Sequence, residues 1–134
     1  MSSIFSKIIK GEIPNYKVAE NEKFYAFLDI NPLAIGHTLV VPKQEIDYLF
    51  DIEDALLQEY IVFAKKVALA IEKNIECKRI AVSVIGLDVP HAHIHLIPLQ
   101  TMNDVNFSKE KVKLTHEEFQ KIASTIEKTF NLFY

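Results

Sequence analysis

The chain has 134 residues, of which 49% are hydrophobic and 25% charged, and its formal net charge is −3. This length predicts a single domain, residues 1–134, with a substantial core. The weak negative charge argues against nucleic acid as the main partner, because phosphate backbones recruit basic surfaces. The single cysteine, Cys77, excludes a disulfide framework. Because no apolar run approaches the ~18 residues of a membrane span and no signal peptide is evident, we expect a cytoplasmic protein without membrane partners.

The first third of the chain predicts a short helix followed by strands. Ser3 can cap a helix over residues 4–9, and Gly11 stands where that helix would end. Runs of β-branched and aromatic residues between polar or proline-containing turns then predict strands. Three such runs cover residues 16–20, 24–28 and 37–42.

The remainder predicts a long helix, two more strands and a terminal helix. Asp51 can cap a helix over about residues 52–74. Residues 102–113 are polar and predict a loop, and Thr115 with Glu118 forms a capping box that opens the last helix. The two strands between the helices cover residues 79–84 and 90–98.

The order of these elements predicts an α+β fold with an antiparallel sheet of about five strands. Short connections between strands favour antiparallel pairing, since parallel strands need long crossovers. The chain has three glycines and lacks both the GxGxxG and the P-loop pattern, which excludes the common phosphate-binding loops.

Three of the five histidines lie in one segment at alternate positions: His91, His93 and His95. Alternate residues of a strand share a face, so the spacing predicts a row of imidazoles. The intervening residues, Ala92 and Ile94, are apolar and predict that the opposite face packs on a core. A helix would scatter the three rings and would give no reason for the spacing.

Three interpretations of this row compete. The histidines could have structural hydrogen bonds only. Two of them could bind zinc with a third ligand from His37 or Asp88, although all three cannot, because the outer pair spans ~13 Å of strand and zinc–nitrogen bonds are about 2 Å long. The third interpretation is nucleophilic catalysis, because a neutral imidazole can attack phosphorus or carbonyl carbon while a second one orients it.

Residues 91–97 match the His-x-His-x-His-x-x signature, with apolar residues at x, and here the chain resembles the histidine-triad (HIT) family, in its Hint-like branch. Residues 4–14, 27–32 and 36–43 are also similar to family segments, in the family's order. The resemblance covers about residues 2–100, and residues 101–134 form a C-terminal loop and helix outside it.

The resemblance implies an activity and an assembly. HIT proteins are nucleotide hydrolases and transferases that act at the α-phosphate through a nucleotidyl-histidine, without a metal or other cofactor for the hydrolysis. They form an antiparallel sheet with a long central helix and a short N-terminal helix, and are usually homodimers whose sheets join.

The resemblance also implies roles for individual residues. His93 matches the nucleophile, His91 and His95 match its flanking partners, and His37 matches a supporting histidine. Asp29 matches the acid that holds the ribose hydroxyls. The family packs the base at positions corresponding to Phe5, Ile8, Ile13, Phe27 and Ile30.

The chain departs from the family pattern just before the histidines. The glycine-rich segment is shortened, Leu87 stands in place of a glutamine, and Asp88 stands in place of the hydroxyl residue that helps bind phosphate. A carboxylate there would repel a phosphate oxygen unless it is protonated or paired. Our hypothesis is that Asp88 alters the preference for the leaving group. Glu45 likewise replaces a histidine that is frequent in the family.

The leading hypothesis is therefore a hydrolase of purine nucleoside 5′-monophosphate derivatives. Phosphoramidates are the first substrate class to test, and dinucleoside polyphosphates are the second. One alternative is a nucleotide-binding regulatory module with little turnover. The other is a metal-dependent hydrolase that uses the histidine row.

Overall fold

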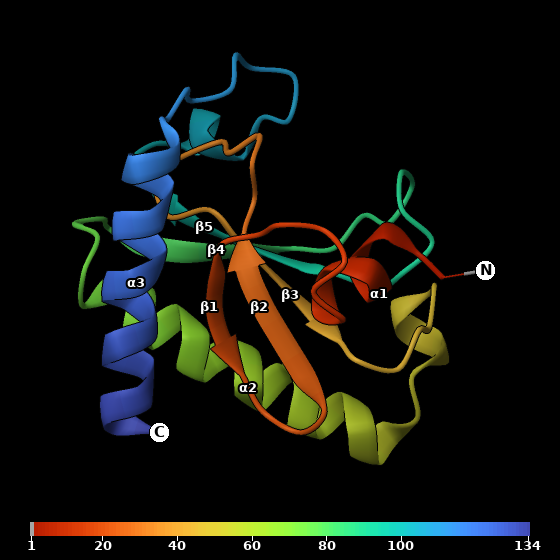
Figure 1. The fold of residues 1–134 in the computed structure, drawn as a ribbon. Coiled ribbons are helices and arrows are strands. Elements are labelled where there is room, and N and C mark those ends of the chain that lie inside the picture. Colours follow the sequence, from red (N-terminus) through yellow and green to blue (C-terminus); the bar gives the residue numbers. More distant parts are fainter. Residues whose placement is uncertain (1) are drawn as a thin grey trace.

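The computed structural model describes residues 2–134, and no helix in that range is long and apolar enough to cross a membrane. The predicted α+β architecture is confirmed: a five-stranded antiparallel sheet carries one long helix, a short N-terminal helix and a C-terminal helix (Figure 1). In chain order the elements are α1 (Ile4–Ile9), β1 (Lys17–Glu20), β2 (Phe24–Leu28), β3 (Thr38–Pro42), the 3₁₀ helix η1 (Leu49–Asp51), α2 (Asp54–Glu72), β4 (Arg79–Ser83), β5 (Ile94–Leu99), the 3₁₀ helix η2 (Met102–Val105) and α3 (His116–Phe133).

The strand order places the histidine segment beside a strand from the first third of the chain. The sheet runs β1-β2-β3-β5-β4, so β5 lies between β3 and the edge strand β4. Leu39 of β3 and Ser83 of β4 are both paired with His95 of β5. His37, which immediately precedes β3, is therefore carried to the same part of the sheet as the histidine row.

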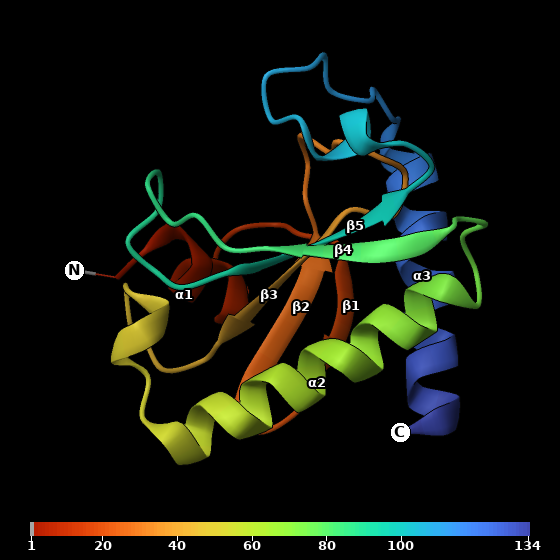
Figure 2. The same ribbon diagram turned by 180° about the vertical axis from the view of Figure 1, so that it is seen from behind.

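The two faces of the sheet form two separate apolar clusters, as the alternation in β2 shows. Phe24, Ala26 and Leu28 belong to the main core with residues of α2 and α3. Tyr25 and Phe27 point the other way and pack with residues of α1 and β3. Figure 2 shows α2 lying across the sheet with the edge strand β4 in view. The sheet is thus a rigid support with helices on both faces, and its α1 face is the one that carries the histidines.

The predicted helix caps are confirmed at α1 and α3 but not at α2. The Ser3 hydroxyl accepts the Ser6 amide, and Thr115 and Glu118 form the capping box of α3. The prediction that Asp51 caps the long helix was wrong, because Asp51 ends the separate 3₁₀ helix η1. Ile52 follows in an extended conformation (ψ 129°) and is buried in the core, so α2 begins only at Asp54, with Glu53 as its N-cap.

The segment predicted as a loop, residues 102–113, is irregular apart from η2. That 3₁₀ helix is opened by a capping box between Thr101 and Asp104, which the sequence prediction missed. The segment is bound to the connection between β2 and β3, where the Val112 amide donates to the Pro32 carbonyl. It therefore lies against the turn between β2 and β3, close to the histidine face.

Candidate active site

The histidine row exists as predicted, but only part of it belongs to a strand. His91, His93 and His95 are all buried, and Ala92 and Ile94 between them lie in the main core. The prediction of a strand from residue 90 was wrong, since β5 begins at Ile94. The His91 amide bonds back to the Val89 carbonyl across Pro90, and the Ala92 amide bonds to Ile46 instead of a sheet neighbour. This turn moves the first two rings away from the ladder while preserving their alternation.

The hydrogen bonds of His93 determine which of its nitrogens carries the proton. Its Nδ1 lies 2.8 Å from the His91 carbonyl oxygen. A carbonyl can only accept, so Nδ1 carries the hydrogen and, in the neutral ring, Nε2 keeps its lone pair. The ring packs edge-on against Phe5, 5.0 Å between centroids, and against His95, 5.1 Å away. His93 is thus held in the tautomer that a nitrogen nucleophile needs.

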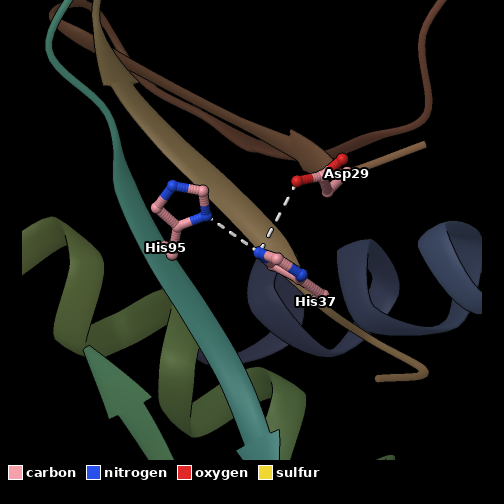
Figure 3. Close-up of side chains that lie close together, drawn as sticks. All are labelled: Asp29, His37 and His95. Carbon is pink, nitrogen blue, oxygen red and sulfur yellow. Dashed lines mark hydrogen bonds and ion pairs between the residues drawn. The ribbon is translucent and has the colours of Figure 1, made fainter. Parts of the chain in front are cut away.

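His37 and His95 form a hydrogen-bonded pair (Figure 3), and one backbone amide determines the tautomers of both rings. The Leu33 N–H donates to Nδ1 of His37 at 3.0 Å. Neutral His37 must therefore carry its hydrogen on Nε2, which lies 3.0 Å from Nδ1 of His95. Nδ1 of His95 in turn accepts, so neutral His95 presents an Nε2–H donor.

Burial keeps this pair uncharged at neutral pH. Desolvation by burial, with a smaller contribution from neighbouring positive charge, lowers the pKa of His37 to about 3 and the pKa of His95 to about 4. Asp29, whose Oδ2 lies 3.6 Å from Nε2 of His37, has its pKa raised by burial, although the amide of Asn31 donates to it. The pair therefore supplies neutral donors rather than cations.

Asp29, His37 and His95 also have the composition of a metal site, because one potential ligand atom of each lies within 4.8 Å of the others. The hydrogen bonds do not fit that use. Nδ1 of His37 is occupied by the Leu33 amide, so a metal at Nε2 would have to displace the ring's only proton. Neutral imidazole is the usual metal ligand. Among residues 2–134, this group therefore fits a hydrogen-bonded chain better than it fits a metal centre.

His91 belongs to a second chain of hydrogen bonds, which runs toward the N-terminus. Its Nε2 lies 2.7 Å from the Pro42 carbonyl oxygen, and its Nδ1 lies 2.7 Å from the Ser3 hydroxyl. Neutral His91 therefore carries its hydrogen on Nε2 and accepts from Ser3. Glu45 accepts both the Ser6 hydroxyl and the Ser3 amide at 2.7 Å, and these bonds lower the pKa of its carboxyl to about 2.

The rings border a cavity of about 480 Å³ between α1, the β2–β3 connection, residues 85–89 and the C-terminal segment. This volume lies within the range of small-molecule sites. Phe5, Ile8 and Phe27 form its buried apolar wall, and Ile30 lies exposed at its rim. All of the predicted site residues line it except His91, which lies behind His93 with no exposed surface: Phe5, Ile8, Ile13, Phe27, Asp29, Ile30, His37, Asp88, His93 and His95.

The structure adds residues that sequence reasoning missed. Phe107 lies edge-on to His95, 5.0 Å between centroids, and Lys111 lines the same cavity. Both come from the polar segment before α3, which has no periodic pattern that would place it. Ser3 was recognised only as a helix cap, and the sequence offered no signal that its hydroxyl reaches His91.

The site is therefore that of an α+β protein with a buried histidine row beside a largely apolar cavity. The family model of the HIT domain matches residues 10–102. The chain belongs to the HIT family.

Comparisons with individual proteins agree with this assignment. The chain is 38% identical to the Hit protein of Bacillus subtilis, over 93% of this chain and 92% of that protein. It is 38% identical to an adenosine 5′-monophosphoramidase of Schizosaccharomyces pombe, over 73% of this chain and 74% of that protein. A crystal structure of a HIT-like protein from Bartonella henselae superposes with a TM-score of 0.81 at 31% identity, covering 96% of both chains.

Proposed function

We propose that this chain hydrolyses purine nucleoside 5′-monophosphate derivatives at the α-phosphorus, with His93 as the nucleophile. The observation that carries the proposal is the tautomer of His93, whose Nδ1–H is held by the His91 carbonyl while the ring lines the cavity. The similarity to a relative named as an adenosine 5′-monophosphoramidase supports the choice of substrate. Adenosine and guanosine 5′-phosphoramidates are the first substrates to test, followed by dinucleoside polyphosphates.

The proposed reaction has two displacements at phosphorus. In the first, the lone pair on Nε2 of His93 forms a bond to phosphorus while the phosphorus–nitrogen bond to the amine breaks. The amine leaves with that electron pair and takes a proton from water. In the second, water attacks phosphorus, the bond to Nε2 breaks, and the nucleoside monophosphate leaves with the water's oxygen while a proton goes to solvent.

The flanking groups have complementary roles in this scheme. The Nε2–H of His95 donates to a phosphate oxygen and stabilises the charge that develops on it. His91 uses its carbonyl to hold His93, and its ring stays behind the reacting centre. Asp29 accepts the ribose hydroxyls, and the apolar wall formed by Phe5 and Phe27 receives the base.

The decisive experiment is hydrolysis of adenosine 5′-phosphoramidate in excess chelator, with the wild type compared with His93→Ala. We expect turnover that survives the chelator and is lost in the variant. If the chelator abolishes wild-type activity and added zinc restores it, the metal-dependent alternative is favoured. Tight binding of AMP without turnover of any phosphoramidate or dinucleoside polyphosphate would favour a nucleotide-binding module instead.

We also propose that two copies of the chain associate through the open edge of the sheet. β4 pairs on only one side, and its Val82 is 58% exposed beside the exposed Ile61 and Leu69 of α2. An edge strand next to an apolar helix face is suited to continuing the sheet into a second copy, as the resemblance to the family implies. Sedimentation should give a dimer for the wild type and a monomer for Val82→Lys, and a monomeric wild type would refute this.

A further inference from the structure

The chain of hydrogen bonds from His91 to Glu45 is continuous, and it is buried up to Glu45, whose side chain is exposed. Ser3 and Ser6 are each less than a tenth exposed, and His91 has no exposed surface. The Ser3 and Ser6 hydroxyl oxygens lie 3.3 Å apart, and Ser6 donates to Glu45 at 2.7 Å. Two serine hydroxyls therefore connect a buried imidazole to a carboxylate that the low pKa keeps ionised.

This chain of hydrogen bonds allows two arrangements of its hydrogens. With neutral His91, the Ser3 hydroxyl donates to Nδ1, and Ser6 donates to Glu45. With a proton on Nδ1, His91 donates to Ser3, Ser3 turns its hydrogen toward Ser6, and Ser6 still donates to Glu45. Only one hydroxyl rotates between the two, and every donor keeps an acceptor. The carboxylate stands at the end of the chain as the counterion in the second arrangement.

We propose that Glu45 is a positioning residue for the hydrolysis, acting through Ser6 and Ser3 on His91 and through the His91 carbonyl on His93. The proposal rests on the proposed function, because it assigns Glu45 a role in that reaction. When Nε2 of His93 bonds to phosphorus, its ring becomes cationic, and the His91 carbonyl is the acceptor that must hold the Nδ1–H. The Glu45 chain holds His91 in place while that charge develops.

The same chain ties the N-terminal helix to the histidines. Ser3 is the N-cap of α1, and its amide as well as its hydroxyl takes part in the chain. Two residues later, the Phe5 ring contacts His91 and His93, at centroid distances of 5.8 and 5.0 Å. Helix α1, which forms one wall of the cavity, and the nucleophile are therefore held by one set of bonds.

A kinetic experiment separates positioning from a purely structural role. We expect Glu45→Gln and Ser3→Ala each to lower kcat on adenosine 5′-phosphoramidate by about tenfold, with KM within about twofold, since one charge-assisted hydrogen bond is weakened. Glu45→Asp keeps the charge and should recover much of the loss. Asp51→Asn is the matched control, because it removes an exposed carboxylate from the nearby 3₁₀ helix η1 and should leave kcat unchanged.

A second measurement does not depend on turnover. ¹⁵N NMR of the histidine rings reports the tautomer and titration of His91 directly. Burial has the largest effect on the pKa of His91 and lowers it. Two charged or titratable groups face His91: the charge of Glu45 raises the pKa of His91, and the charge of His93 lowers it. Removal of the Glu45 charge in Glu45→Gln should therefore lower the pKa of His91 and leave the tautomer of His95 unchanged.

The outcomes discriminate between the proposals. A rise in KM with unchanged kcat in both variants would show that the chain only holds the wall of the cavity, and would overturn the positioning role. An identical His91 titration in the wild type and Glu45→Gln would overturn it independently. If the wild type turns over none of the substrates, the proposed function fails, and the NMR titration still decides whether Glu45 controls His91.

Discussion

Two chains of hydrogen bonds flank His93, and they differ in how they end. The downstream chain, Leu33–His37–His95, begins at a backbone N–H, so each donor and acceptor along it has one possible direction. The upstream chain, His91–Ser3–Ser6–Glu45, ends at a carboxylate and contains hydroxyls that can rotate.

This difference separates two demands of the proposed reaction. A donor aimed at a phosphate oxygen must not change its tautomer, and the downstream chain enforces that with an amide that can only donate. The group behind the nucleophile must tolerate a developing positive charge, and the upstream chain supplies a negative end.

Breaking the downstream chain of hydrogen bonds should cause the largest loss of activity. In His37→Ala, Nδ1 of His95 loses its donor, so the ring can move its hydrogen from Nε2 to Nδ1 and cease to donate to phosphate. In a serine protease, a catalytic histidine in the wrong tautomer lowers kcat about 10⁴-fold. We expect His37→Ala to lower kcat by about 10²–10⁴-fold here. Steady-state kinetics measures the loss, and ¹⁵N NMR of His95 checks its cause. A loss below threefold would contradict the role assigned to the pair.

The downstream chain should also make folding sensitive to acid. Folding lowers the pKa of His37 and His95 far below the ordinary value of 6.5, to about 3 and about 4. Below pH 6.5 the unfolded chain therefore binds protons that the folded chain excludes, so stability is full above pH 6.5 and falls as pH drops toward the folded pKa values. The slope is about 1.4 kcal/mol per pH unit for each histidine.

Urea unfolding at pH 7 and pH 5 measures this effect. The free energy of unfolding should decrease by roughly 2–4 kcal/mol for the wild type and by less for His37→Leu, which removes one titrating ring. Equal decreases in the two proteins would show that other groups cause the acid sensitivity.

Phe107 and Lys111, from the segment before α3, lie beside the downstream chain, which gives a smaller and more local prediction. The Lys111 ammonium is held by the carbonyls of Phe107 and Lys109, and its charge lowers the pKa of Asp29 and of His37. Lys111→Met should therefore raise the pKa of Asp29 further, so that a larger fraction of Asp29 is protonated and cannot accept both ribose hydroxyls. We expect KM to rise by about three- to tenfold, with kcat nearly unchanged.

Lys113→Met is the control for that prediction. It makes the same charge change two residues away, on an exposed side chain that does not line the cavity. Equal KM changes in the two variants would indicate a general electrostatic effect of the segment. A change in the His91 titration of Lys111→Met would contradict the separation of the two chains.

The sequence predicted the histidine face and the fold, but not the two chains of hydrogen bonds. Alternation alone placed His91, His93 and His95 on one side, and the strand pattern with short turns predicted the antiparallel sheet. Resemblance to the HIT family pointed to Asp29 and Phe5, which line the cavity. The tautomers, however, depend on backbone groups of Leu33, Pro42 and His91, and backbone groups leave no trace in a residue pattern.

Other misses have equally local causes. Asp51 has the right residue type for a cap, but burial of Ile52 delays the helix. Phe107 lies in a polar stretch whose place is set by the 3₁₀ helix η2 and by the bond from Val112 to Pro32. In both places, tertiary contacts override a local signal or act where no local signal exists.

The smallest expected effect concerns Asp88, which lies on neither chain. It is exposed and lines the cavity together with His93. Its negative charge should disfavour an anionic leaving group relative to an amine, but solvent and salt screen an exposed charge. We therefore expect Asp88→Ser to raise the rate on dinucleoside polyphosphates relative to phosphoramidates by only about threefold, and less at high salt. Because neither chain includes Asp88, the ¹⁵N signals of His91 and His95 should not change in this variant. If the relative rates on amine and phosphate leaving groups stay the same, Asp88 does not set the preference, and the shortened loop around Leu87 becomes the next position to vary.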